Sequence, residues 1–217
     1  MKIASISENK NLEKRVAVTP EIARKYISSG FELFLSENYA KHLGINDQQY
    51  KDLGVKFSNN EKDLITNSDI IIQLGCLSDD KLEILKDNQI IVGILNPYKN
   101  KDRLVQLNKK NIKCFSLELL PRITRAQSMD VLSSQANLAG YKAVVESFSE
   151  FEKAIPMMMT AAGTIPAAKV LVVGAGVAGL QAIATAKRMG AIVFATDVRM
   201  ASKEQVESLG GKFLTVE

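Results

Sequence analysis

The sequence predicts an α/β protein with two lobes, each built on a parallel sheet flanked by helices. In the first half of the chain, short apolar segments alternate with amphipathic segments of helical period, as expected for parallel strands joined by helices. In the second half, the β-branched run Lys169–Val173 leads into glycines at 174, 176 and 179 and then into a helical segment. This strand–turn–helix unit is typical of Rossmann-like sheets, so we expect two Rossmann-like lobes.

The first lobe is expected at residues 1–127. Its first helix begins at Thr19-Pro20, because threonine is a favoured N-cap and proline suits the first helical position, and it ends at Gly30. The expected strands are Ile3–Ile6, Phe31–Leu35, Val55–Phe57, Ile70–Leu74, Ile90–Leu95 and Ile112–Leu117. The expected further helices are Gln48–Leu53, Glu61–Thr66, Asp79–Leu85 and Lys101–Lys109.

Residues 128–151 have a helical pattern, with Ser128 as the expected N-cap, and are expected to connect the lobes. Residues 152–217 are expected to form the first half of the second lobe. After the glycine-rich turn and its helix, we expect these elements: a strand at Ala191–Thr196, a helix at Lys203–Leu209 and a third strand at Lys212–Val216. A complete fold of this kind has about six strands, so we expect the second lobe to be truncated after its third strand.

Composition excludes several classes of function. The chain has 217 residues, 46% apolar and 24% charged, and its net charge of +4 is scattered, which argues against a nucleic-acid partner. Cys76 and Cys114 are not clustered, so we expect core thiols and neither a disulfide nor a metal site. The single histidine, His42, excludes a zinc site built on several histidines.

The segment Ala154–Ala186 carries one charge, at Lys169, but it does not predict a membrane span. Pro156, Gly163, Pro166 and the later glycines interrupt it, and its pieces fit a loop, a buried strand and a buried helix. The chain begins directly as a strand, without the apolar stretch of a signal peptide. We therefore expect a cytoplasmic chain without a transmembrane segment.

The glycine-rich turn predicts a dinucleotide site. Gly174 permits the tight turn, Gly176 lets a pyrophosphate approach the backbone, and Gly179 lets helix and strand pack closely. Asp197 follows 23 positions after the first glycine, where an acid accepts hydrogen bonds from the adenosine ribose and favours NAD over NADP. Its alternative role is that of a capping or loop aspartate. Arg199 could hold a 2′-phosphate, but Asp197 would repel that group.

Two further segments are candidate binding regions. Residues 120–130 offer two arginines, Gln127 and Asp130 in a loop expected to face the cleft between the lobes; the alternative is a surface loop with a helix cap and an Arg–Asp pair. Three consecutive methionines at 157–159 are expected to fill the core, with ligand binding as the less favoured role.

Several of these segments, and the opening run Lys14–Pro20, resemble a known family. They are Pro121–Asp130, Ser133–Tyr141, Met157–Thr164, Gly174–Arg188 and Ala195–Arg199. Together they are similar to the NAD(H)-binding component (alpha subunit, domain I) of proton-translocating NAD(P) transhydrogenase, which is related to the alanine dehydrogenase family. The resemblance covers essentially the whole chain, and members of the family continue well past Glu217.

The resemblance implies roles for individual residues. Arg122, Gln127 and Asp130 match the loop that holds the nicotinamide end of NAD(H) and positions it for hydride transfer, with Gln127 placed to meet the partner's nucleotide. No residue is expected to act as an acid or base, and none to bind a metal. The full set of expected cofactor-binding residues is Arg122, Ile123, Thr124, Gln127, Asp130, Ser133, Gly174, Gly176, Val177, Gly179, Asp197, Val198 and Arg199.

The resemblance also implies an activity and partners. Hydride would be exchanged between NAD(H) on this chain and NADP(H) on a partner component, and a membrane proton-channel component would couple that exchange to proton translocation. The chain would form a homodimer and lie in the cytoplasm, peripheral to the inner face of the cell membrane through its partners.

Two other functions remain open. An amino-acid dehydrogenase of the alanine dehydrogenase type shares both lobes, but that family uses a lysine and a histidine where this chain has Gln73 and Ile94. A non-enzymatic NAD-sensing module is the second alternative. Turnover of alanine would favour the dehydrogenase, and binding of NADH without hydride exchange would favour the sensor.

Overall fold

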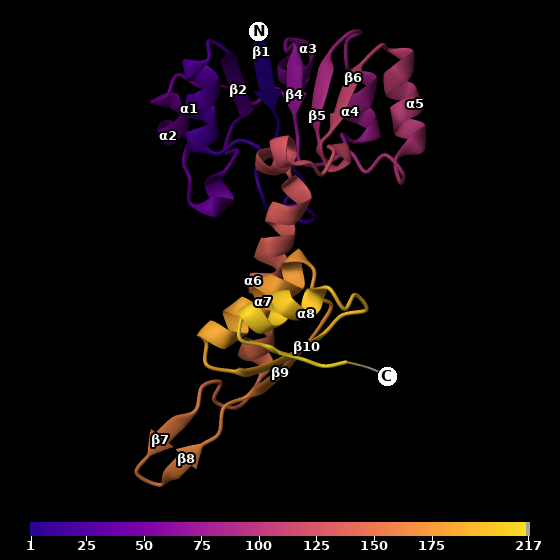
Figure 1. The fold of residues 1–217 in the computed structure, drawn as a ribbon. Coiled ribbons are helices and arrows are strands. Elements are labelled where there is room, and N and C mark those ends of the chain that lie inside the picture. Colours follow the sequence, from indigo (N-terminus) through magenta and orange to yellow (C-terminus); the bar gives the residue numbers. More distant parts are fainter. Residues whose placement is uncertain (216–217) are drawn as a thin grey trace. The chain divides into compact units, whose positions relative to one another are not determined.

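A computed structural model describes residues 1–215, which form two compact units (Figure 1). The units divide between Met129 and Asp130, close to the predicted end of the first lobe at residue 127. The long helix predicted at 128–151 is grouped with the second unit, and its role as a connector between lobes stays a prediction.

The first unit is built on a six-stranded sheet in which every strand is parallel to its neighbours. Its strands are β1 (Lys2–Ser5), β2 (Glu32–Ser36), β3 (Lys56–Ser58), β4 (Ile70–Ile72), β5 (Ile90–Gly93) and β6 (Lys113–Ser116). They lie in the order β3-β2-β1-β4-β5-β6, which confirms the predicted Rossmann-like sheet. The order reverses between β1 and β4, and ligands of such sheets bind beyond the carboxyl ends of the strands at that point.

Helices cover both faces of this sheet, because side chains alternate along each strand. Ala4, Ile71 and Ile91 face one apolar cluster and Ile3 and Leu33 face another. The helices α3 (Glu61–Thr66), α4 (Asp79–Glu83) and α5 (Lys101–Lys109) pack into the first cluster, and α1 (Pro20–Ser28) and α2 (Asp47–Lys51) into the second.

The predicted signals at the ends of α1 are confirmed. The Thr19 side chain accepts a hydrogen bond from the Ile22 N–H at 3.4 Å, and Pro20 occupies the first helical position. Gly30 follows the helix with φ +83°, a left-handed conformation that favours glycine. Two single turns of 3-10 helix, η1 (Lys41–Leu43) and η2 (Leu117–Leu119), complete the unit before the loop.

The second unit has a three-stranded parallel sheet in the order β11-β10-β9. Its elements are α6 (Val131–Glu150), β9 (Lys169–Val173), α7 (Val177–Arg188), β10 (Ile192–Thr196), α8 (Ser202–Ser208) and β11 (Lys212–Phe213). The α7 helix packs on β9 and β10, α8 packs on β11, and α6 packs on α7. The strand predicted to end at Val216 ends at Phe213, and Val216 itself lies outside the described residues.

The prediction that Lys169–Val173 is a buried strand is wrong. In β9 the side chains of Leu171 and Val173 are 59% and 79% exposed, whereas Val170 and Val172 are partly buried against the core cluster. The helices of this unit cover one face of the sheet, and within residues 1–215 no strand pairs with the outer edge of β9. An edge strand covered on one face buries only every second side chain.

The predicted N-cap of the long helix is also wrong. Residues 124–129 form a 3-10 helix, η3 (Thr124–Met129), so Ser128 lies within a turn and α6 begins three residues later. The carboxylate of Asp130 accepts a hydrogen bond from the Ser133 N–H at 2.9 Å and caps the helix. Aspartate is among the strongest N-cap residues, and Asp130 supplies the cap that Ser128 was expected to supply.

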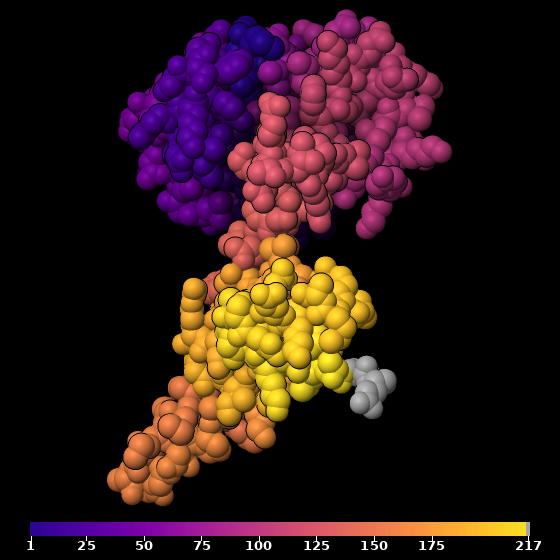
Figure 2. Space-filling model, viewed as in Figure 1, coloured from indigo at the N-terminus to yellow at the C-terminus, as the bar shows by residue number. Residues whose placement is uncertain are grey.

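The methionine-rich segment forms an exposed hairpin and not core filler. β7 (Met158–Thr160) pairs antiparallel with β8 (Gly163–Ile165), in a region expected to be a loop. Met157 and Met159 are 62% and 83% exposed, and the hairpin projects from the second unit in Figure 2. A two-stranded hairpin has no interior of its own, so these side chains lie on the surface.

The two cysteines are free thiols, but they are not core residues as predicted. Cys76 is partly buried and Cys114 is exposed. Burial raises the pKa of both thiols. Among residues 1–215, none of the helices is both long enough and apolar enough to span a bilayer.

Candidate functional site

The glycine-rich turn at the end of β9 leaves the beginning of α7 open. Gly174 has φ +97°, and its N–H donates to the Thr196 carbonyl at 2.8 Å, which joins the turn to the end of β10. Gly176 is the N-cap of α7, no side chain caps the helix there, and a Cβ at this position would meet no atom within 4 Å. The first N–H groups of α7 are therefore available to an anion, which the helix dipole also favours.

Gly179 is required by packing. A Cβ at Gly179 would lie 1.8 Å from the Gly174 carbonyl oxygen, far inside van der Waals contact. A larger residue would push α7 away from the turn and from β9. Val177, in the first turn of α7, is 45% exposed and lies at the open end of the helix.

Asp197 follows β10 and binds the glycine-rich turn directly. Its side chain is only 6% exposed. The carboxylate accepts hydrogen bonds from the Ala175 N–H at 2.7 Å and the Arg199 N–H at 2.8 Å. The Arg199 guanidinium adds two more, from Nε at 3.0 Å and Nη2 at 3.1 Å, and this pairing, followed by the main-chain donors, holds the pKa of Asp197 well below its usual range.

These residues fit the adenosine and pyrophosphate parts of a dinucleotide. The turn has space above Gly176, the uncapped end of α7 offers N–H groups, and a buried carboxylate stands at the end of the second strand. Val198 is fully exposed beside that carboxylate. The alternative of a loop-capping aspartate also holds in part, because Asp197 already binds two main-chain N–H groups.

The loop predicted to hold the nicotinamide divides between the two units. Arg122, Ile123, Thr124 and Gln127 are exposed in the first unit, where the buried Ala126 anchors η3. In the second unit, the Asp130 carboxylate accepts hydrogen bonds from both the N–H and the hydroxyl of Ser133, at 2.9 and 2.7 Å. The predicted pair Asp130 and Ser133 is thus brought together, by capping a helix.

Sequence reasoning missed a cavity in the first unit. It has a volume of about 450 Å³ and lies beyond the carboxyl ends of β1, β4 and β5, where the strand order reverses. Its charged lining residues are Glu8, Glu13, Arg15, Lys81 and Arg103. The strand order β3-β2-β1-β4-β5-β6, had it been inferred, would have indicated this place.

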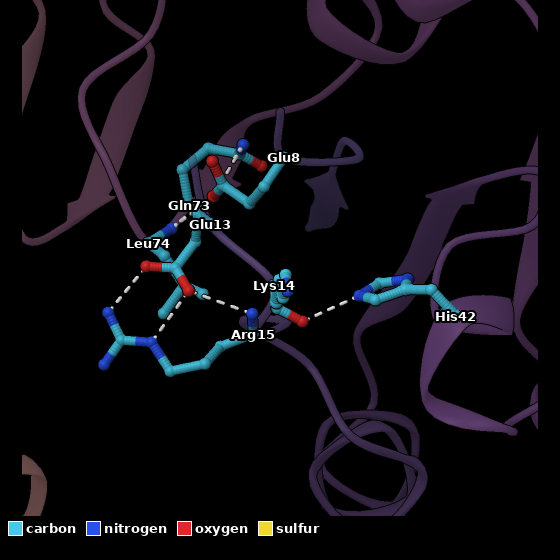
Figure 3. Close-up of polar contacts among 7 residues, drawn as sticks. All are labelled: Glu8, Glu13, Lys14, Arg15, His42, Gln73 and Leu74. Atoms are coloured by element: carbon cyan, nitrogen blue, oxygen red, sulfur yellow. Dashed lines mark hydrogen bonds and ion pairs between the residues drawn. The ribbon is translucent and has the colours of Figure 1, made fainter. Parts of the chain in front are cut away.

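Every cation of the cavity is already paired with an acid. Arg15 contacts Glu13 at 2.6 Å, as Figure 3 shows. Lys81 Nζ lies 2.9 Å from a Glu61 oxygen, and Arg103 Nε lies 2.7 Å from an Asp79 oxygen. A small anion entering this cavity would have to compete with these carboxylates.

Gln73 closes the floor of the cavity. Its Oε1 accepts hydrogen bonds from the Ile6 N–H at 2.8 Å and the Ser5 hydroxyl at 3.2 Å, and its Nε2 donates to Glu8 at 3.2 Å. Glu8 also accepts from the Leu74 N–H at 2.7 Å (Figure 3). Burial raises the pKa of Glu8, although the main-chain donors oppose that shift. The amide of Gln73 is therefore occupied in joining β1 to β4.

His42 has a structural contact. Its Nε2 lies 2.7 Å from the Lys14 carbonyl oxygen (Figure 3), which tethers the segment 8–15 to η1. Within residues 1–215, no cluster of three or more histidine, cysteine or acidic side chains has the arrangement of a metal site.

Comparison with known proteins agrees with both halves of the chain. The family described as "Alanine dehydrogenase/PNT, N-terminal domain" matches residues 5–139, and "Alanine dehydrogenase/PNT, C-terminal domain" matches residues 143–217. The first of the separate chains of NAD(P) transhydrogenase subunit alpha in Rickettsia prowazekii is 48% identical over 221 residues, a match that covers all of this chain and 58% of that protein. The chain thus spans little more than half the length of this curated relative.

Solved structures give the same picture. A transhydrogenase from Sinorhizobium meliloti superimposes with a TM-score of 0.93 at 46% identity, over 98% of this chain and 64% of that one. An L-alanine dehydrogenase superimposes with a TM-score of 0.85 over the whole chain and 61% of its own length, but at 21% identity it shows a shared fold alone.

Proposed function

The chain belongs to the alanine dehydrogenase/PNT family, and on that premise we propose that it is the NAD(H)-binding part of a proton-translocating NAD(P) transhydrogenase. In this function hydride passes between NAD(H) on this chain and NADP(H) on a partner component. The exchange is coupled to proton movement through a membrane component. The 48% identity to a transhydrogenase alpha-subunit chain supports this branch of the family.

The observation that carries the proposal is the constellation at the end of β9. An open glycine turn, an uncapped helix of 12 residues and a buried carboxylate 23 positions after the first glycine occur together. We propose that the pyrophosphate lies at the beginning of α7 and the adenosine ribose at Asp197. An acid at the ribose disfavours a 2′-phosphate by charge repulsion, so NAD(H) is the expected nucleotide.

The protein's part in the reaction is to bind, orient and exclude water. NAD(H), when bound, supplies the hydride chemistry, and hydride transfer between two nicotinamides moves no proton at the reacting carbons. Arg122, Gln127 and Asp130 are proposed to fix the nicotinamide ring, with Gln127 toward the partner's nucleotide. Orientation of this kind is a major source of rate enhancement.

The Gln73 network disfavours an amino-acid dehydrogenase. That family places a lysine at this position, and here a 4% exposed glutamine spends both ends of its amide on β1 and Glu8. The nearby Arg15 is paired with Glu13. Ile94, where that family has a histidine, offers no proton-transfer group. Measurable NADH formation from alanine would contradict the transhydrogenase proposal.

We further propose a homodimer that associates with the other two components at the inner face of the cell membrane. The exposed hairpin supports self-association, because Met157, Met159 and Ile165 present apolar surface from one projecting element. The nicotinamide-fixing residues Arg122 and Gln127 are exposed, as residues that meet a partner's nucleotide must be.

The proposal is tested by two measurements on the same preparation. Fluorescence titration gives the NADH dissociation constant, and a spectrophotometric assay with a nicotinamide analogue follows hydride exchange when an NADP(H)-binding component is added. Tighter binding of NADH than of NADPH, together with exchange, is expected. Binding without exchange would favour the NAD-sensing alternative.

The loop residue Gln127 offers a sharper prediction. Gln127→Asn shortens the side chain by one methylene, so it should slow hydride exchange by about tenfold or more while changing NADH affinity less than about twofold, since misorientation affects the transfer step. Thr124→Ser, a similar loss of one carbon in the same turn, is the matched control. An unchanged exchange rate in Gln127→Asn would show that the loop is only structural.

A further inference from the structure

The Asp197 carboxylate has no acceptor position free for a ligand. Carboxylates offer about four lone-pair positions. Two are taken by the main-chain N–H groups of Ala175 and Arg199, and two by the Arg199 guanidinium. The ribose contact proposed above therefore requires one of these hydrogen bonds to break.

The four hydrogen bonds differ in how readily they can be exchanged. The main-chain donors are held by the glycine turn and by the end of β10, because the neighbouring Gly174 N–H is bonded to the Thr196 carbonyl at 2.8 Å. The Arg199 side chain is 63% exposed, and exposed ion pairs contribute little to stability. The guanidinium is thus the donor that a ligand can displace without disturbing the fold.

We propose that the Arg199 guanidinium is an internal substitute for the adenosine ribose, which reaches Asp197 only by displacing it. The inference rests on the proposed function and names Arg199 as a positioning residue that acts through Asp197. A guanidinium presents two adjacent N–H donors to one carboxylate. The 2′,3′-diol of a ribose presents two adjacent O–H donors and can occupy the same two acceptor positions.

This exchange makes Asp197 selective. A ribose with a 2′-phosphate lacks one of the two hydroxyl donors and brings negative charge toward the carboxylate, so it cannot replace the guanidinium. When no nucleotide is bound, the guanidinium keeps the carboxylate ionised and hydrogen-bonded. Arg199 therefore lowers the affinity for every nucleotide, but only a free diol regains the lost contacts.

The test is the sign of the change in NADH affinity when the guanidinium is removed. Arg199→Ala should lower the NADH dissociation constant by about two- to fivefold, the range set by a weak exposed ion pair. Arg199→Lys, which offers one point-like donor group, should lie between. Arg188→Ala removes the same charge from an exposed site at the end of α7 and should leave affinity equal or weaker.

A spectroscopic readout separates displacement from a general change in affinity. The Nε–H resonance of Arg199, assigned by its loss in Arg199→Lys, should lose its protection from solvent exchange when ADP-ribose binds. At the same occupancy, 2′-phospho-ADP-ribose should leave it protected. Asp197→Ala should remove the protection without any ligand and should weaken NADH binding and narrow the preference over NADPH.

The possible failures are distinguishable. If the wild-type protein binds NADH and Arg199→Ala binds it equally or more weakly than Arg188→Ala, Arg199 is a direct ligand contact and the substitution model is overturned. If the wild-type protein does not bind NADH at all, the proposed function itself is wrong.

Discussion

At the residue scale, the buried polar side chains near both candidate ligand positions are saturated by their own neighbours. Gln73 uses its amide to join β1, β4 and Glu8, and Asp197 uses its carboxylate to join the glycine turn to the end of β10. Burying such groups without partners would cost free energy, so the fold supplies partners from adjacent loops. A ligand at Asp197 must exchange with them.

Glu8 gives a prediction at this scale. Its half-buried carboxylate accepts from Leu74 and Gln73, and burial raises its pKa. Glu8→Gln keeps the accepting Oε1 and removes the buried charge, so the free energy of unfolding at pH 7 should change by less than about 1 kcal/mol. Glu8→Ala leaves the Leu74 N–H without its acceptor and should cost about 1–3 kcal/mol. Urea titration measures both values.

The pH dependence follows from the sign of the Glu8 shift. Because the folded state binds the proton more tightly than the unfolded state, the contribution of Glu8 to stability is full below the unfolded pKa of about 4.3 and is lost as pH rises through the higher folded pKa. Glu8→Gln should remove that decline from the stability–pH curve, and the exposed Glu21→Gln should not. Identical curves for Glu8→Gln and wild type would contradict the assignment.

At the scale of elements, two glycines set how closely the helices of the second unit approach their neighbours. A Cβ at Gly140 in α6 would lie 2.0 Å from the Ala178 carbonyl oxygen in α7, and one at Gly179 would lie 1.8 Å from the Gly174 carbonyl oxygen. Both obstacles are main-chain atoms, so no side chain can move aside. The position of α7, and with it the open helix N-terminus, depends on both contacts.

Gly140→Ala tests this packing. Alanine favours a helix over glycine by about 1 kcal/mol, but the overlap with α7 should outweigh that gain and lower the free energy of unfolding by about 1–3 kcal/mol. Asn137→Ala, an exposed site in the same helix, raises helix propensity without a clash and should stabilise slightly. Chemical denaturation compares the two. Stabilisation by Gly140→Ala would show that α6 and α7 are not closely packed.

At the scale of the whole molecule, each unit presents a ligand position beyond the carboxyl ends of its parallel strands, and the positions differ in their chemistry. The first unit completes its six-stranded sheet, and its cavity is lined by cations that are each paired with an acid. The second unit offers an uncapped helix end and a carboxylate. The second is the position suited to a dinucleotide.

The exposed hairpin gives the prediction at this scale. If Met157–Met159 mediate a homodimer, light scattering should give twice the 23.8 kDa mass of one chain, and Met159→Asp should shift the protein toward monomer by placing a charge in an apolar interface. Tyr98→Asp, at a 90% exposed side chain in the first unit, is the matched control. A dimer that persists in Met159→Asp would exclude the hairpin as the interface.

Local chemistry explains most of what the sequence predicted. The helices Glu61–Thr66 and Lys101–Lys109 and the capped start at Thr19-Pro20 agree with the structure, because caps and apolar period act over a few residues. The glycine turn and its spacing to Asp197 are likewise local in sequence, and the strand–turn–helix unit formed where it was expected. The sequence by itself therefore determined the fold class and the dinucleotide constellation.

Contacts between distant segments were decided only by the tertiary structure. The exposure of the methionines and of β9, the cap at Asp130 and the paired cavity of the first unit depend on which surfaces are covered by neighbours. The saturation of Asp197 by Arg199 depends on the course of two residues after β10, which no spacing rule specifies. Sequence period fixes which side of an element is apolar, but only packing fixes what lies against it and which donors reach a buried carboxylate first.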